Sequence, residues 1–229
     1  MKTRKEGAVT VTLLFCRNER RGKMTRLKES KLDEMLLEYS FAKKILETEL
    51  EILLKEYEYR NNATPVEHIK SRLKSKSSVI TKLQNKGYEL TEENIKKHVH
   101  DMVGFRIVCS FLSDVYDIVN IIKTSKKFKI KDESDYIKNP KDSGYISYHL
   151  NVLVPVYLKE KVEYIEAEIQ IRTVAMDFWA SLDHKLRYKL PEDIPVYLQR
   201  EMLACSDDIK ILDSKMQHLY EIVKKYQEK

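Results

Sequence analysis

The chain has 229 residues, of which 42% are hydrophobic and 34% are charged, and it has only five glycines and five prolines. This composition excludes an intrinsically disordered or collagen-like chain and indicates a globular protein rich in helices. The three scattered cysteines exclude a disulfide framework and a cysteine-rich metal site, and they favour a cytoplasmic location.

The net charge of +6 is concentrated at the N-terminus. Residues 1–31 contain ten Lys or Arg and three Glu, a net charge of +7, so the remaining chain carries −1. We therefore expect no nucleic-acid partner for the folded body. We also expect no membrane partner, because the apolar run Ala8–Cys16 is too short to span a bilayer.

Residues 1–26 are interpreted as a basic N-terminal extension. Ala8–Cys16 follows three cations, as in a secretory signal, but arginines come after it and no small-residue cleavage site is present. A second interpretation is that residues 1–23 are a translated leader and Met24 is the natural start, because the amphipathic pattern begins only after Met24.

The remaining chain predicts one domain over residues 27–229. Apolar residues recur at intervals of three and four from Leu32 to Tyr57, which predicts an amphipathic helix over residues 27–60. The elements expected after it are strands over 66–74, 104–111, 128–132, 145–154 and 161–172, and helices over 75–85, 91–102, 113–126, 173–188 and 195–226. We predict an α+β fold with a mixed, largely antiparallel central sheet of about five strands, flanked by helices. The last two strands should pair antiparallel through a turn over 155–160.

The first candidate site segment is 66–82. Arg72 and Lys74 share a strand face, and Ser78 and Lys82 are neighbours on the following helix, whose N-terminus favours anions. These groups suit a polyphosphate. The alternative interpretation is a solvated, lysine-rich helix.

The second candidate segment begins at the dipeptide His100-Asp101. Asp101 directly precedes a buried strand, from which Arg106 points off the polar face. An aspartate at this position is either a metal ligand or a cap. A metal-dependent phosphohydrolase would need further His and Asp ligands, and the sequence does not supply that set.

The third candidate segment is Lys141–His149. Gly144 permits a tight entry into a strand on which Tyr145, Ser147 and His149 share a face. An aromatic side chain beside a lysine and a histidine can stack on a base and contact its phosphates. Ordinary packing in a half-buried strand is the alternative.

Residues 161–172 carry the most informative pattern. Apolar and polar residues alternate, so one face of this strand is apolar, and the other carries Glu166, Glu168, Gln170 and Arg172. The polar face is either a solvated surface or a site for a metal ion and a phosphate, because carboxylates bind Mg²⁺ and arginine binds phosphate oxygens.

The joint order of these motifs resembles the synthetase domain of the RelA/SpoT family, over about residues 35–215. The short length resembles the small alarmone synthetases, RelP and RelQ. The motifs that carry the resemblance are Arg72-x-Lys74, Asp101-x-x-Gly104-x-Arg106, Ser143-Gly144-Tyr145-x-Ser147-Tyr148-His149, Glu168-Ile169-Gln170-Ile171-Arg172-Thr173 and Ala175–Lys185.

The resemblance implies a nucleotidyltransferase-like synthetase fold that transfers pyrophosphate from ATP to the 3′-hydroxyl of GDP or GTP and releases AMP. It implies that Asp101 and Glu168 hold Mg²⁺ and that Glu168 also takes the proton of the 3′-hydroxyl. The implied ATP-binding residues are Arg72 and Arg106 on the adenine and Lys74, Ser78 and Lys82 on the phosphates. The implied GDP- or GTP-binding residues are Tyr145 on the guanine, Lys141 and His149 on the phosphates, and Gln170.

Two departures from the family pattern stand out. Ile146 replaces a polar residue that relatives often have, which would weaken contact with the phosphates of the acceptor nucleotide. His68, Lys70 and Asp177 match the positions of an allosteric product site, where Asp177 would repel a polyphosphate. We therefore favour a RelP-like enzyme without strong product activation.

The resemblance also implies a homotetramer assembled through the terminal helices, and no hydrolase activity. The alternatives are a monomer that packs both helices on its own sheet, and a catalytically inactive guanine-nucleotide sensor or RNA-binding regulator. A related nucleotidyltransferase that releases pyrophosphate is a further alternative.

Overall fold

The computed structural model describes residues 6–189 and 194–227, with side chains described for 31–186 and 194–226. The first five residues of the predicted N-terminal extension lie outside this part. The chain divides into two compact units. One comprises the chain up to Tyr39 together with Ser75–Val99, and the other comprises Ser40–Lys74 together with the chain from His100 onwards.

The helix α1 spans Glu6–Asn61. The helix predicted over 27–60 is present, but it begins 21 residues earlier than the apolar pattern suggested. Residues 6–26 contain no proline and include several Leu, Arg and Glu, so their propensity permits a helix even without an amphipathic pattern. Asn62 ends the helix with a φ of 47°, a left-handed conformation that asparagine tolerates.

The first unit contains two further helices, α2 (Lys76–Asn85) and α3 (Glu92–His98). Ser75 caps α2 by accepting a hydrogen bond from the Ser78 N–H, and Gly87 follows the helix with a φ of 73°, as a C-terminal stop requires. The helix α3 is shorter than predicted because the backbone of Val99 leaves the helical region.

The second unit is built on a five-stranded sheet. The strands are β1 (Val66–Leu73), β2 (Val103–Cys109), β3 (Lys129–Asp135), β4 (Tyr148–Tyr157) and β5 (Val162–Thr173). Their order is β1-β2-β5-β4-β3; β2 and β5 run parallel and every other neighbouring pair runs antiparallel. The predicted fold class is confirmed.

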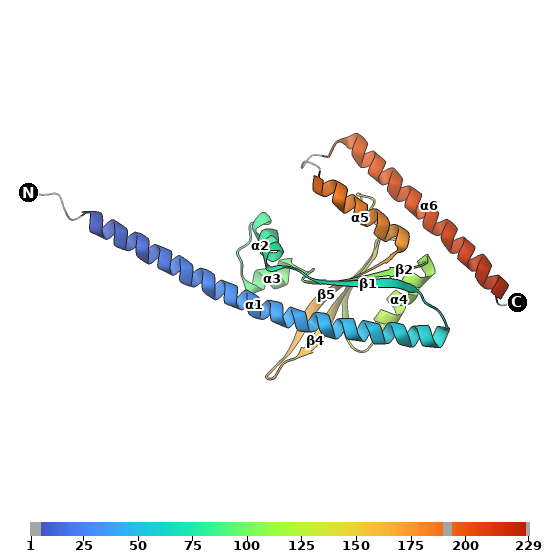
Figure 1. The fold of residues 1–229 in the computed structure, drawn as a ribbon, viewed down its shortest axis with the longest axis horizontal. Coiled ribbons are helices and arrows are strands. Elements are labelled where there is room, and N and C mark those ends of the chain that lie inside the picture. Colours follow the sequence, from blue (N-terminus) through green and yellow to red (C-terminus); the bar gives the residue numbers. More distant parts are fainter. Residues whose placement is uncertain (1–5, 190–193, 228–229) are drawn as a thin grey trace, which may run out of the picture. The chain divides into compact units, whose positions relative to one another are not determined.

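One face of this sheet forms the core of the second unit. The helix α4 (Leu112–Thr124) packs on β5, β2 and β4 and buries Ile118 and Ile122 (Figure 1). The C-terminal part of α1 lies beside α4, where the Tyr57 hydroxyl donates to Asp117 at 3.1 Å. Burial of these apolar side chains is the main source of stability for this unit.

The hairpin between β4 and β5 differs from the prediction. Pro155 was expected in the turn but lies within β4, opposite Tyr164, and the turn is shorter. Pairing of β4 with β3 ends at Leu153, so β4 is an edge strand at Pro155, where a residue without an N–H is tolerated.

Two helices end the chain, α5 (Val174–Lys189) and α6 (Val196–Gln227), and they run side by side (Figure 1). Trp179, the only tryptophan of the chain, is buried between them and donates to the Met202 carbonyl at 3.3 Å. The helix α6 carries an exposed apolar stripe at helical spacing, in which Leu212, Met216, Leu219 and Val223 are between 44 and 53% exposed. Within the described residues, no helix combines the length and the hydropathy needed to cross a bilayer.

Candidate functional site

The polar face of the sheet brings the predicted site segments of the second unit together. The pairing of the five strands aligns two rows of residues across the sheet. Each row contains one residue from each strand, in the order β1-β2-β5-β4-β3. The first row is Arg72, Gly104, Glu168, Asn151 and Asp132, and the second is Lys70, Arg106, Gln170, His149 and Ser134. Cations therefore lie on β1 and β2, and the carboxylate of Glu168 lies at the centre.

Asp101 lies in the turn before β2 and is held by cations. Its carboxylate accepts from the Lys74 ammonium at 2.7 Å, and the Arg72 guanidinium lies 3.7 Å away. The Asp101 side chain is 21% exposed. This carboxylate is therefore accessible, and its charge is already partly compensated.

Glu168 has the same exposed fraction, 21%, but its partners are a histidine and an amide. His149 Nδ1 lies 3.2 Å from one carboxylate oxygen, and Gln170 Nε2 donates to the other at 2.8 Å. Burial raises the pKa of Glu168, but the hydrogen bond and the charge interaction with His149, together with the hydrogen bond from Gln170, bring its pKa below the ordinary value. The negative charge of Asp101 is close enough to oppose this lowering. Glu168 is thus an ionised carboxylate at neutral pH.

A cavity of about 190 Å³ opens beside Glu168. Arg72, Gly104, Arg106 and Glu168 are among its lining residues. The Arg72 side chain packs over Gly104, since a Cβ at this position would lie 3.4 Å from Arg72 Cγ, an ordinary contact distance. Burial and the charge of Arg172 lower the pKa of Arg106, and Asp177 counters this effect. Two guanidinium groups therefore border a cavity that a flat heterocycle could enter.

Lys141, Tyr145 and His149 gather on the other side of Glu168. The Tyr145 hydroxyl lies 2.8 Å from His149 Nε2. The Lys141 ammonium lies 4.4 Å from the centre of the Tyr136 ring and 5.2 Å from that of Tyr145. Tyr136, which the sequence did not single out, packs edge-on against His149 and completes this aromatic group.

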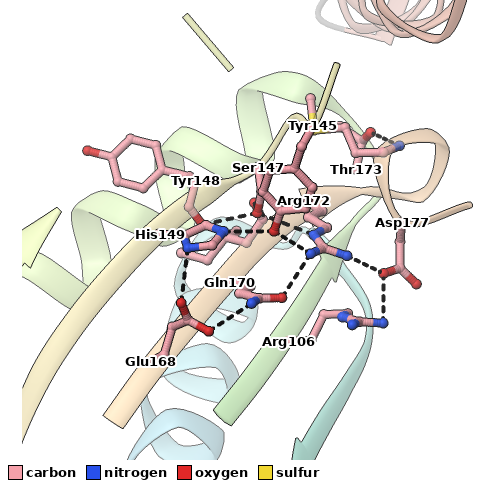
Figure 2. A network of polar contacts seen from close by, with 12 residues as sticks. Arg106, Tyr145, Ser147, Tyr148, His149, Glu168, Gln170, Arg172, Thr173 and Asp177 are labelled. Atoms are coloured by element: carbon pink, nitrogen blue, oxygen red, sulfur yellow. Dashed lines mark hydrogen bonds and ion pairs between the residues drawn. The ribbon is translucent and has the colours of Figure 1, made fainter. Parts of the chain in front are cut away.

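The site also contains a buried arginine, Arg172, which the sequence suggested only as a phosphate ligand on the polar face of β5. The Arg172 side chain is 4% exposed and donates to Tyr145, Gln170, Ser147 and Asp177 (Figure 2). Because Tyr145 and Ser147 lie more than 20 positions away in the chain, only the tertiary structure identifies these partners. The polar alternation of β5 was the one signal available for Arg172.

Asp177 has its charge compensated by two arginines. Its Oδ1 lies 3.1 Å from Arg172 and 3.1 Å from Arg106 (Figure 2). The sequence suggested that Asp177 would repel a polyphosphate. In the structure, the charge of Asp177 is balanced by these two arginines of the second unit. His68 and Lys70, its predicted companions, are exposed on β1.

The other predicted residues are placed as follows. Ser78 and Lys82 lie on α2, in the first unit, where the Ser78 hydroxyl lies 2.8 Å from that of Ser75. Ile146 is 2% exposed and belongs to the core. Gly144 has a φ of 83°, which confirms the expected tight turn before β4.

Asp101 and Glu168 are the residues that could hold a divalent cation. Among the described side chains, no group of three or more His, Cys, Asp or Glu is arranged to bind a metal ion. Mg²⁺ does not require such a group, because it commonly binds through one or two carboxylates together with water and substrate phosphates. Each Glu168 oxygen accepts one of these two hydrogen bonds, so a second lone pair on each oxygen is available. The donor set fits Mg²⁺.

The chain matches the family model described as the region found in RelA / SpoT proteins over residues 71–193. It is 48% identical over 181 residues to GTP pyrophosphokinase YwaC of Bacillus subtilis (strain 168), covering 79% of this chain and 86% of that protein. Small alarmone synthetase 2 from Bacillus subtilis has a similar structure, with a TM-score of 0.73, 44% identity and coverage of 82% of this chain and 97% of that chain. Small alarmone synthetase 1 from Bacillus subtilis, bound to its product pppGpp, gives a TM-score of 0.75, 32% identity and coverage of 84% and 98%.

Proposed function

The chain belongs to the RelA/SpoT family, and on this premise we propose that it is a small alarmone synthetase, a GTP pyrophosphokinase that forms ppGpp or pppGpp. In this reaction the 3′-oxygen of GDP or GTP attacks the β-phosphorus of ATP, and AMP leaves with the bridging oxygen. The observation that carries the proposal is the ionised Glu168 at the centre of the polar face, beside Asp101 and a cavity lined by arginines.

Glu168 is proposed as the general base. A carboxylate within hydrogen-bond reach of the 3′-hydroxyl can accept its proton as the bond to phosphorus forms. The hydrogen bonds from His149 and Gln170 fix the carboxylate in one orientation, and each oxygen keeps a lone pair for the hydroxyl or a metal ion. Positioning of this kind is the main contribution of a protein to phosphoryl-type transfer.

Asp101 and Glu168 would hold Mg²⁺. The ion, when bound, neutralises charge on the phosphate oxygens as the reaction proceeds. Lys74 compensates Asp101 in the structure, and its ammonium could turn to the phosphates of ATP once a cation lies beside the carboxylate.

The ATP side of the site is assigned to β1 and β2, and the family resemblance adds Ser78 and Lys82. Arg72 and Arg106 border the cavity and are proposed to stack on the two faces of adenine. Lys74, Ser78 and Lys82 are proposed to contact the phosphates.

The acceptor side is assigned to Lys141, Tyr145, His149 and Gln170. Tyr145 is proposed to stack on guanine, with the Lys141 ammonium above its ring in reach of the phosphates. His149 and Gln170 are proposed to position the acceptor nucleotide directly over Glu168, to which both are bonded.

The protein is further proposed to be a cytoplasmic homotetramer. The support is the exposed apolar stripe of α6, because an apolar surface of this extent is typical of a subunit interface. Light scattering on the purified protein measures the assembly state; a mass equal to one 27.2 kDa chain would contradict the tetramer.

One incubation separates the proposal from its alternatives. The protein is mixed with ATP, Mg²⁺ and either GDP or GTP, and the nucleotides are resolved by anion exchange. We expect AMP together with ppGpp or pppGpp. Release of pyrophosphate in place of AMP would indicate a different nucleotidyltransferase, and bound but unreacted nucleotides would indicate an inactive sensor; each of these results would overturn the proposal.

A further inference from the structure

The proposed base and four other side chains form a closed cycle of hydrogen bonds (Figure 2). Glu168 contacts His149 Nδ1 at 3.2 Å, and His149 Nε2 contacts the Tyr145 hydroxyl at 2.8 Å. The Arg172 NH2 group donates to Tyr145 at 2.5 Å and to Gln170 Oε1 at 2.8 Å, and Gln170 Nε2 returns to Glu168 at 2.8 Å. We call these five residues the Glu168 cycle.

The chemistry of Arg172 fixes the direction of three bonds in the Glu168 cycle and leaves the Tyr145 proton for a fourth. A guanidinium has only donors, so Tyr145 and Gln170 must both accept from it. Gln170 accepts through its carbonyl oxygen, and its amide nitrogen is therefore turned towards Glu168. The Tyr145 oxygen accepts from Arg172, which leaves its own proton available for His149 Nε2, and we assign the bond between them in that direction.

This direction defines the state of His149. A neutral histidine whose Nε2 accepts a hydrogen bond must carry its proton on Nδ1, and Nδ1 faces Glu168. Both branches of the Glu168 cycle therefore end in a donor to Glu168, one on each oxygen.

Arg172 is itself held so that it cannot rotate. Its Nε donates to the buried Ser147 hydroxyl at 3.3 Å and its NH1 donates to Asp177 at 3.1 Å. The NH2 group uses both of its protons in the Glu168 cycle. A 4% exposed guanidinium with all three nitrogens engaged is a rigid reference point within the sheet.

We propose that Arg172 is a positioning residue that acts on Glu168 through two intermediates, Tyr145–His149 on one side and Gln170 on the other. It touches neither the base nor the reacting atoms, and it dictates that both neighbours of Glu168 present donors to it. The proposal deepens the proposed function, since it rests on Glu168 as the base.

The first test reads the tautomer of His149 and needs no activity. The protein is labelled with ¹⁵N-histidine, and the His149 signals are identified among the six histidines by their loss in His149→Gln. We expect the nucleotide-free protein to carry the His149 proton on Nδ1 alone. The spectrum is read under conditions where the ring is neutral, and a neutral ring with its proton on Nε2 would overturn the proposed direction.

The second test separates kcat from KM in two variants. Arg172→Met removes the group that orients both neighbours of Glu168, and we expect kcat to fall about 10- to 100-fold, as for other residues that orient a ligating side chain, with the KM for ATP changed less than about threefold. Arg172→Lys, which keeps one donor, should recover part of the loss. A change confined to KM, or no change in kcat, would contradict the positioning role.

A third variant covers the case in which a buried arginine cannot be replaced without unfolding. Gln170→Glu still accepts from Arg172 but presents an acceptor to Glu168, so we expect the same 10- to 100-fold loss of kcat with folding retained. The matched control is Glu166→Gln, an exchange between acid and amide on the same face of β5, outside the Glu168 cycle, for which we expect kcat within about threefold. Full kcat in Gln170→Glu would overturn the proposal.

The tests distinguish this proposal from the proposed function. If the wild-type protein forms no alarmone but His149 carries its proton on Nδ1, the function fails and the direction of the Glu168 cycle stands. If the wild-type protein is active and the proton lies on Nε2, only the role of Arg172 fails.

Discussion

The two faces of β5 belong to one strand and share one hydrogen-bond ladder, yet different forces hold their side chains. On the core face, Ala167, Ile169 and Ile171 are fully buried. On the opposite face, Glu166 and Glu168 are 15 and 21% exposed and each has two polar partners. Burial is not directional, whereas hydrogen bonds and ion pairs are. Substitutions on the core face should therefore change stability, and substitutions on the polar face should change catalysis. Neither kind of substitution should have much effect on the other property.

The largest expected effect is on the polar face. Glu168→Gln removes the proposed base while it keeps the shape of the side chain. We expect AMP formation to fall about 10³-fold or more, since a general base contributes 10²- to 10⁴-fold and this residue is also a proposed metal ligand. Nucleotide binding, measured by calorimetry, and the melting temperature should change little. Glu166→Gln is the matched control, and equal losses in the two variants would contradict a specific role for Glu168.

The next effect is on the core face. Ile169→Ala truncates a side chain with no exposed surface, and we expect the free energy of unfolding to fall by about 2 to 5 kcal/mol. Urea denaturation followed by circular dichroism measures it. Val162→Ala, a truncation at a 46% exposed position of the same strand, should change stability by less than about 0.5 kcal/mol. A large loss of kcat in folded Ile169→Ala would show that the two faces are coupled.

A smaller effect is expected where cations compensate the carboxylate. Asp101→Asn keeps an acceptor for Lys74 and removes one negative charge from the proposed metal site. We expect the Mg²⁺ concentration for half-maximal AMP formation to rise at least about tenfold, with partial recovery at high Mg²⁺. An unchanged Mg²⁺ dependence would show that Asp101 is not a ligand.

The smallest effect concerns the end of β5, where Thr173 donates to Asp213 of α6 at 2.7 Å. Burial raises the pKa of Asp213, although the bond from Thr173 opposes this. A carboxyl whose pKa is raised in the folded state loses its stabilising contribution as pH rises through that pKa. Asp213→Asn should therefore gain stability relative to the wild type as pH increases from below about 4, the ordinary value. Melting curves from acid to neutral pH measure the difference in stability between the variant and the wild type. A variant that loses stability relative to the wild type as pH rises would contradict the prediction.

How far the sequence predicts the structure differs between the same two faces. Strict alternation between Ile165 and Arg172 was sufficient to predict β5 and its core side, because a period of two has one structural meaning. The sheet, its mostly antiparallel pairing and the segments of the polar face in the second unit were also predicted. These segments carry residues whose order along the chain resembles that of the RelA/SpoT family.

The partners on the polar face could not be predicted in the same way. Arg172 meets Tyr145 and Ser147 because these residues lie in the segment just before β4, which begins at Tyr148 and not at residue 145 as predicted, and because Tyr148 pairs with Ile171. The spacing of residues defines neither the start of a strand nor its register. The start of α1 was missed for a different reason, since residues 6–26 form a helix without the apolar periodicity on which the prediction depended.

Trp179 gives this protein an optical probe of its own. As the single indole of the chain, buried where α5 meets α6 and bonded to the Met202 carbonyl, it reports on one place only. Its fluorescence emission should shift to longer wavelength if α6 leaves α5, while far-ultraviolet dichroism is unchanged as long as both helices persist. The docking of the last helix can therefore be followed in unlabelled protein, separately from global unfolding.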